Sequence, residues 1–160
     1  MVFPFASFPA FGFSGSRSSV PSVCAGVAAR VPLGARVFVG CAAGVDAFFR
    51  GAFPGAVVCS VSFVGRGAFA ARSSACVRAV QSAGGLWVSF PSGPCPAGVV
   101  PSRRWRSSAG SGSWGSLALA VGLGVPVLVF APFGVPSGWG FSPLGSGWFC
   151  LLPPAQLSLV

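Results

Sequence analysis

Apolar residues along the chain gather in short continuous runs, which alternate with longer segments where small and polar residues recur at helical spacing. The runs are rich in Val and Phe and are bounded by glycine, proline or serine, a pattern typical of buried strands. The longer segments between them predict helices. The predicted strands are residues 10–13, 35–40, 55–63, 86–90 and 125–130, and the predicted helices are residues 20–31, 43–53, 67–85 and 113–124.

Two of these helices carry local signals of their own. The first follows Ser18 and Ser19, either of which can cap its N-terminus, and Pro21 suits its first turn. The helix at 67–85 ends at a pair of glycines, which commonly stop a helix. Its helical spacing places one set of side chains together, namely Phe69, Ser73, Cys76, Val77 and Val80.

Strands that alternate with helices, and that are apolar throughout, are typical of a parallel sheet covered on both faces. Five strands at intervals of roughly 30 residues predict an α/β fold, namely a Rossmann-like, doubly wound and mainly parallel sheet of about five strands with helices on both faces. We assign residues 1–131 to this domain. Residues 132–160 are rich in Gly, Pro and Trp, show no period, and are interpreted as an extension packed on the same domain.

The composition is basic and apolar, with ten arginines, one acidic residue, a formal net charge of +9 and 53% hydrophobic residues. This balance suggests a nucleic-acid or membrane partner. However, Asn, Ile, Lys, Thr, Tyr, His and Glu are all absent, and every codon for them contains adenine in the standard genetic code. Only Met1, Asp46, Gln81 and Gln156 require adenine. The positive charge is therefore partly a consequence of an adenine-poor coding sequence.

No segment predicts a membrane-spanning helix, because the best candidate, residues 117–132, is shorter than the required length of about 20 residues and contains Gly122, Gly124 and Pro126. Residues 1–13 have no basic residue and two prolines, unlike a signal peptide. We therefore expect a cytoplasmic protein without a membrane partner. The six cysteines form no C-x-x-C pair and no histidine is present, so we expect buried free thiols, with no metal and no cofactor.

Three turns rich in glycine and serine lie between a predicted strand and a predicted helix, at residues 12–19, 39–48 and 109–116. In a parallel sheet, ligands bind beyond the carboxyl ends of the strands. Small residues let a phosphate approach the backbone, amides at a helix start point at it, and an arginine adds bidentate hydrogen bonds. The predicted ligand-binding residues are Gly15, Ser16, Arg17, Gly40, Gly44, Asp46, Gly110, Gly112 and Ser113.

Asp46 is the sole acidic residue, and the coding bias works against it. Two interpretations stay open. Its carboxylate can cap the helix at 43–53 and interact favourably with the helix dipole. Alternatively, it can contact a ribose or a base, or hold Arg17 toward a phosphate. Because no acid partner accompanies it, we predict no catalytic residue.

A second candidate region is the sequence RRWR, which combines cations with an indole ring as proteins that stack on single-stranded bases do. A solvated loop is the other interpretation. Arg66 and Arg72, around the turn after the third strand, either line the same cleft as the three turns or face solvent. The predicted nucleic-acid contacts are Arg103, Arg104, Trp105 and Arg106.

Three stretches of the chain resemble the DprA-like branch of the SLOG superfamily, which also includes the LOG phosphoribohydrolases and lysine-decarboxylase-like proteins. GFSGSRS (12–18) is similar to the strand and G-S-R turn of that family. VFVGCAAGVDAFF (37–49) resembles its G-x-A-x-G-[IV]-D element. GSGSWGSLALAVGLGVPVLVF (110–130) looks like its G-S-G-[ST] turn, with the helix and strand that follow.

The resemblance implies a Rossmann-like domain that binds a nucleotide or a nucleic-acid phosphate and, for DprA itself, single-stranded DNA binding and loading of the RecA recombinase. The hydrolytic SLOG members carry a glutamate in a P-G-G-x-G-T-x-x-E motif, whereas this chain has no glutamate. We therefore predict a protein that binds a nucleotide or single-stranded nucleic acid and is more a binding module than an enzyme. An enzyme that cleaves N-glycosidic bonds through Asp46, and a nucleotide sensor that acts on a partner protein, are the alternatives. A homodimer stays open.

Overall fold

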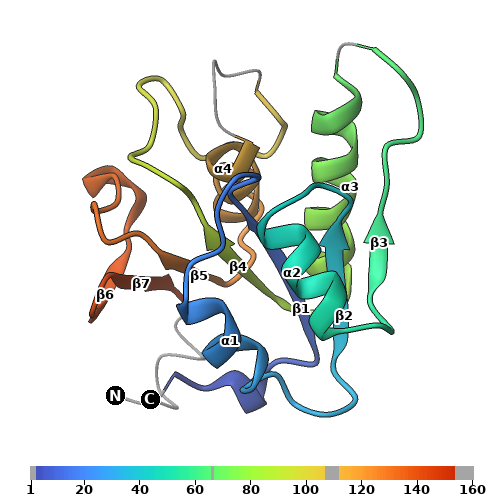
Figure 1. Ribbon diagram of the computed structural model, residues 1–160. Helices are drawn as coiled ribbons and strands as arrows, with labels where there is room; N and C mark the ends of the chain where they lie inside the picture. Colours follow the sequence, from blue (N-terminus) through green and yellow to red (C-terminus); the bar gives the residue numbers. More distant parts are fainter. Residues whose placement is uncertain (1–2, 66, 107–111, 154–160) are drawn as a thin grey trace.

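The computed structural model describes residues 3–65, 67–106 and 112–153, which form one mixed sheet with helices on both faces (Figure 1). The protein thus has an α/β fold. The strands are β1 (Ala10–Gly15), β2 (Arg36–Gly40), β3 (Val57–Cys59), β4 (Leu86–Phe90), β5 (Val127–Phe130), β6 (Ser142–Gly145) and β7 (Trp148–Leu151). The α-helices are α1 (Val23–Ala28), α2 (Val45–Ala52), α3 (Ala68–Ser82) and α4 (Gly112–Gly122). No helix in these ranges combines the length and the apolar character that crossing a bilayer requires.

The strand order is β3-β2-β1-β4-β5-β7-β6, and the strands from β3 to β5 in this order all run parallel. β1 lies at the centre of the parallel part, where it pairs with β2 on one side and with β4 on the other. Every residue of β4 is buried, which explains why its sequence is apolar except for Ser89 instead of alternating. The carboxyl ends of β1, β2 and β4 therefore meet at one edge of the sheet.

The sheet has seven strands where the sequence predicted about five, because residues 132–160 contribute two. β7 pairs antiparallel with β5, and β6 pairs antiparallel with β7. β6 has four residues, among them Pro143 and Gly145, so neither its length nor its composition indicates a strand. The turn between β6 and β7 contains Ser146 with a φ of 52° and Gly147 with a φ of 83°.

Helix α1 begins later than the sequence predicted. Its N-cap position is Ser22, which makes no side-chain capping hydrogen bond, and Pro21 lies before the helix. Ser18 and Ser19 are not caps, because their backbone N–H groups donate to the hydroxyl of Ser16, each at 3.2 Å. The serine-rich stretch after β1 therefore folds into its own turn before the helix starts.

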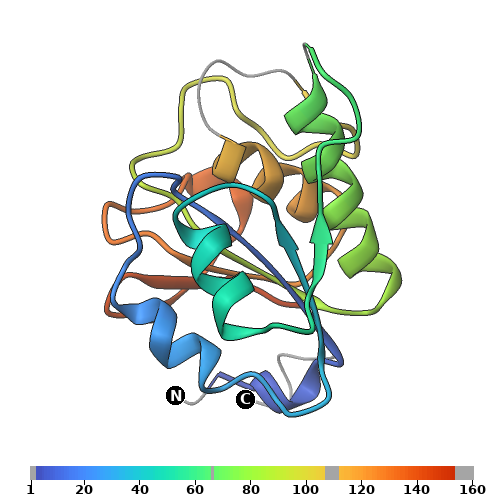
Figure 2. The same cartoon turned by 45° about the vertical axis from the view of Figure 1, so that its right-hand side comes forward.

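Helices cover both faces of the sheet (Figure 2), and an apolar cluster lies on each face. The first, the phenylalanine side, joins α1 and α2 to the sheet and includes Phe11, Phe13, Phe49 and Phe90. The second, the tryptophan side, joins α3 and α4 to the sheet and includes Trp87, Trp114 and Trp139.

Candidate functional site

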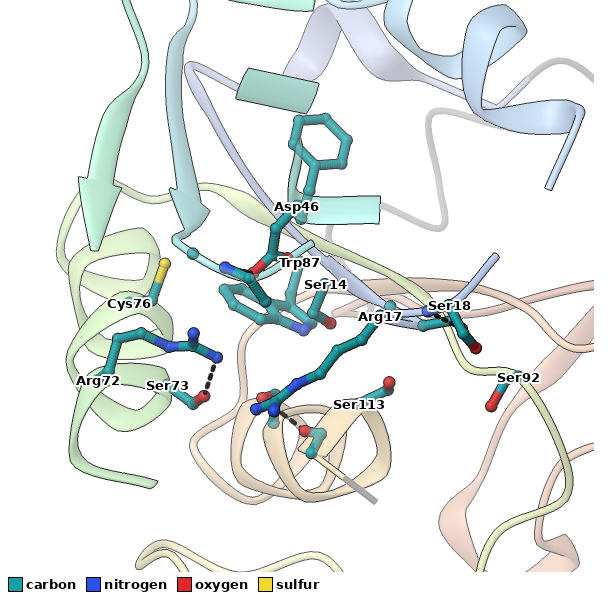
Figure 3. A pocket seen from close by; sticks show the side chains of 17 residues that line it. Ser14, Arg17, Ser18, Asp46, Arg72, Ser73, Cys76, Trp87, Ser92 and Ser113 are labelled. Carbon is teal, nitrogen blue, oxygen red and sulfur yellow. Dashed lines mark hydrogen bonds between the residues drawn. The ribbon is translucent and has the colours of Figure 1, made fainter. Parts of the chain in front are cut away.

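A cavity of about 420 Å³ opens where β1, β2 and β4 end (Figure 3). Its walls come from the turns after β1 and β2, from α3, and from the first turns of α2 and α4. Seven of the predicted ligand-binding residues line it, namely Gly15, Ser16, Arg17, Gly40, Asp46, Gly112 and Ser113. The three glycine- and serine-rich turns thus reach one common pocket.

Of the two remaining predicted residues, Gly110 lies outside the described residues, and Gly44 does not line the pocket. Gly44 has a φ of +70°, and a Cβ there would collide with the carbonyl oxygen of Ser16 and come within 2.8 Å of the Cα of Arg17. The N–H of Val45 donates to that same Ser16 oxygen at 2.9 Å. Gly44 therefore holds the turn after β2 against the turn after β1 and acts as a positioning residue.

The turn after β1 is ordered by its own hydrogen bonds. Ser16 is 6% exposed, its hydroxyl accepts the two N–H groups named above, and its own N–H donates to Phe90 at 3.1 Å. Arg17 is exposed, and its Cζ lies 4.6 Å from the ring centroid of Phe69. No described residue hydrogen-bonds to the Arg17 guanidinium. Its donors are therefore available to a ligand, and Figure 3 shows the side chain extending across the pocket.

Asp46 does not cap its helix, which corrects one of the two interpretations of this residue. The N-cap position of α2 is Gly44, so Asp46 lies inside the first turn. Its carboxylate is directed at the preceding turn, where Oδ2 accepts the N–H of Ala42 at 3.2 Å. The side chain is 6% exposed, and burial raises its pKa, opposed by the Ala42 hydrogen bond and by nearby arginines. No ion pair joins the carboxylate to Arg17 or to another arginine of the described chain.

Arg50 fixes the turn after β2 from the other end of α2. Its Nη1 donates to the carbonyl oxygens of Gly40 at 2.7 Å and of Ala42 at 2.8 Å. Sequence reasoning missed this residue, because an arginine in the last turn of a helix already has a simple explanation in the helix dipole.

Arg72, on α3, forms one wall of the pocket (Figure 3). Its Nη1 donates to the Sγ of Cys41 and its Nη2 to the hydroxyl of Ser73, both at 3.4 Å. Its Nε is buried and has no hydrogen-bond partner. A Cβ on Gly40 would touch the Asp46 carboxylate and come within 3.4 Å of the Arg72 Cζ, so only glycine fits between these charged groups.

The cysteines are all free, but they are not all buried as the sequence suggested. Cys24, Cys76 and Cys150 are buried, whereas Cys41 is exposed. The hydrogen bond from Arg72 lowers the pKa of Cys41. Burial raises the pKa of Cys24 to about 12. Among the residues that the structure describes, no three His, Cys, Asp or Glu side chains come together as metal ligands would.

Several lining residues were not anticipated from the sequence. Ser92 follows β4 and could have been found by the rule that identified the three turns. Trp87 could not, because it lies inside an apolar strand with no polar neighbour in sequence except Ser89. The lining residues that were missed and that lie outside the three predicted turns are Ser73, Cys76, Trp87 and Ser92.

The RRWR region does not line the pocket. Trp105 is half-buried, and its ring packs on α4, where a Cβ on Gly115 would come within 2.6 Å of the indole. The carbonyl oxygen of Arg103 accepts a hydrogen bond from Arg78 at 3.1 Å. Arg103, Arg104 and Arg106 are exposed. Their contact with nucleic acid stays a prediction, although the indole is turned against a helix.

The pocket offers cationic and helix-start N–H donors on one side and one carboxylate on the other. Gly112 and Ser113 belong to the first turn of α4, whose N–H groups have no acceptor within the helix. Together with Arg17, they form a partly positive region. Asp46 provides the carboxylate. No protein-family model, curated protein or solved structure matches this chain.

Proposed function

We propose that the chain binds a nucleotide, either free or as one unit of a single-stranded nucleic acid, and that its fold is a Rossmann-like doubly wound domain of DprA/SLOG type. The observation that carries the proposal is the convergence of three separate glycine- and serine-rich turns on one cavity. The order β3-β2-β1-β4-β5 supports the fold, because the direction of winding reverses between β1 and β4. Ligands of doubly wound proteins bind beside such a reversal, and this pocket lies there.

The charge distribution favours one orientation of the nucleotide. The phosphate binds at the first turn of α4, where N–H groups that have no acceptor within the helix and the Arg17 guanidinium both favour an anion. The nucleoside lies toward Asp46, because a buried carboxylate repels a phosphate and accepts hydrogen bonds from hydroxyl or amino groups. Asp46 then contacts the sugar or the base.

The pocket volume favours a single nucleotide. A cavity of about 420 Å³ falls at the lower end of the range of about 300–1,000 Å³ that is typical of small-molecule sites. A longer strand needs additional contacts outside the cavity, and the exposed arginines at 103–106 could supply them.

The environment of Asp46 favours binding of a nucleotide over cleavage of its N-glycosidic bond. The carboxylate is 6% exposed and already accepts the Ala42 N–H. General acid–base catalysis needs a group within reach of the proton that it moves, and here no second carboxylate or histidine exists in the whole sequence.

The test is a titration of the protein with ribonucleoside 5′-monophosphates and with DNA and RNA oligomers of about ten nucleotides, at several salt concentrations. We expect saturable mononucleotide binding and competition between mononucleotide and oligomer. A logarithmic salt slope near −0.7 for the oligomer indicates about one phosphate contact, and a steeper slope indicates that arginines outside the pocket take part. Absence of binding by both kinds of probe contradicts the proposal.

A further inference from the structure

Trp87 lines the inner end of the pocket, here called the pocket floor, and a glycine on the neighbouring strand leaves space for its ring. The residue is 2% exposed, and its ring packs over Gly12 in the middle of the neighbouring strand β1. A Cβ on Gly12 would come within 2.5 Å of the indole Cε3 and within 2.6 Å of Val80. Glycine weakens a strand interior, so its presence here is explained by the space that the indole needs.

The indole N–H of Trp87 is buried and has no hydrogen-bond partner among the described residues. The nearby hydroxyls of Ser14 and Ser89 pair with each other instead, at 3.2 Å. Figure 3 shows the indole nitrogen turned toward the middle of the pocket, beside Ser14. A buried donor without an acceptor is unfavourable, and tryptophan N–H groups in protein interiors usually have a partner.

Trp114 provides the internal comparison. It is also almost completely buried, at 1% exposed, but its Nε1 donates to the carbonyl oxygen of Gly93 at 2.8 Å. The tryptophan side thus supplies an acceptor for an indole where the surroundings are protein. The indole of Trp87 instead borders a ligand-sized cavity, and its N–H has no partner among the described residues.

We propose that the Trp87 N–H donates a hydrogen bond to the bound ligand, and that it selects ligands with a neutral acceptor atom at the pocket floor. The acceptor is a carbonyl oxygen or ring nitrogen of a base, or an oxygen of the sugar. This inference rests on the proposed function, because it specifies which part of a nucleotide reaches the floor. The proposed function places the phosphate at the first turn of α4 beside Arg17, which leaves the pocket floor to the sugar or the base.

The decisive variant is Trp87→Phe, which keeps an aromatic ring and removes the donor. The probes are AMP, GMP, CMP and UMP, with ribose 5-phosphate and inorganic phosphate as truncated ligands. We expect affinity for at least one nucleotide to fall about tenfold, the effect of one hydrogen bond, while affinity for inorganic phosphate stays unchanged. If the affinity for ribose 5-phosphate also falls, the acceptor is a sugar oxygen. If only the affinity for nucleotides falls, the acceptor is an atom of the base.

Stability separates this role from a purely structural one. Trp87→Phe shortens a buried ring and lowers the free energy of unfolding through the cavity that it leaves, but it breaks no hydrogen bond to a described residue. Trp114→Phe is the matched control for stability, because it leaves a comparable cavity and also breaks the hydrogen bond to Gly93, so it lowers the free energy of unfolding further. Trp148→Phe, in β7 and outside the pocket, is the control for binding.

Three results overturn the inference. If the wild-type protein binds nucleotides and Trp87→Phe binds them equally well, the role of the Trp87 N–H is wrong but the proposed function stands. If the wild-type protein binds none, the proposed function fails with it. If Trp87→Phe loses as much stability as Trp114→Phe, the N–H has a partner in the free protein. If Trp87→Phe does not fold, NMR of the wild-type protein provides the test. We expect the indole N–H resonance of Trp87 to shift when a nucleotide is added. A resonance that does not shift contradicts the inference.

Discussion

The two faces of the sheet are both apolar, but they differ in whether their polar atoms have partners. On the phenylalanine side, Phe13 and Phe49 stack with ring centroids 3.8 Å apart and an interplanar angle of 7°. Phenyl rings bring no hydrogen-bonding group, so this cluster is complete by itself. The tryptophan side contains indoles, and one of them, Trp87, keeps an N–H without a partner. Among the described residues, the phenylalanine side therefore leaves no ring donor unsatisfied, whereas the tryptophan side holds one donor that the proposed ligand would satisfy.

The cysteines differ with burial and not with the face of the sheet. Cys24 is buried on the phenylalanine side, where burial alone raises its pKa to about 12. Cys76 is buried on the tryptophan side, and a hydrogen bond with Cys59 together with burial raises its pKa as well. Cys41 follows β2 and is exposed, and the hydrogen bond from Arg72 lowers its pKa.

The largest expected effect comes from breaking the phenylalanine side with Phe49→Ala. Phe49 is fully buried, and truncating such a ring leaves a cavity, which costs about 3–5 kcal/mol of unfolding free energy. Urea denaturation measures the loss. Phe63→Ala, at a side chain that is 46% exposed, is the control and is expected to change stability by less than about 0.5 kcal/mol. Similar losses in both variants contradict the assignment of the core.

A smaller effect is expected from Asp46→Asn, which keeps an acceptor for the Ala42 N–H and removes the charge. Burial raises the folded-state pKa of Asp46 above its ordinary value of 3.8, so the folded protein holds the proton more tightly than the unfolded chain. Stability is therefore greatest below that value and falls as the pH rises through the folded-state pKa, by about 1.4 kcal/mol for each unit of pKa difference.

Few other groups of this protein titrate in the pH range where the stability effect of Asp46 is measured. Asp46 is the only acidic side chain and no histidine is present, so the terminal carboxyl group is the one other group that titrates in the acidic range. Denaturation of the wild-type protein and Asp46→Asn from about pH 3 to about pH 7 isolates the contribution of Asp46. We expect the variant to become the more stable protein as pH rises. A wild-type advantage that grows with pH means that the arginines outweigh burial and contradicts the account.

Much of the parallel sheet could be predicted from the sequence, because buried strands and glycine-rich turns are local patterns. β4 matches its predicted range of 86–90, and the turns after β1 and β2 reach the pocket as expected. β6 and β7 could not be predicted in this way. β7 forms because it pairs with the edge of β5, and the segment that contains β6 and β7 has little strand propensity of its own.

Side-chain partners were harder to predict than elements. Asp46 lies at the helix start that the sequence indicated, but it bonds to the turn before the helix, because Gly44 occupies the N-cap position. Phe69 shares the helical spacing of Ser73 and Cys76, yet it is 51% exposed. Its ring instead lies beneath the guanidinium of Arg17, a contact between segments far apart in sequence.

We propose that the edge of the sheet where β1, β2 and β4 end binds the phosphate of a nucleotide. The most direct measurement compares mononucleotide affinity in Arg17→Ala and Arg103→Ala, two exposed arginines of which only Arg17 lines the pocket. Loss of a charged hydrogen-bond donor predicts a fall of about 10- to 100-fold for Arg17→Ala and almost no change for Arg103→Ala. Equal affinities in the two variants would contradict the claim.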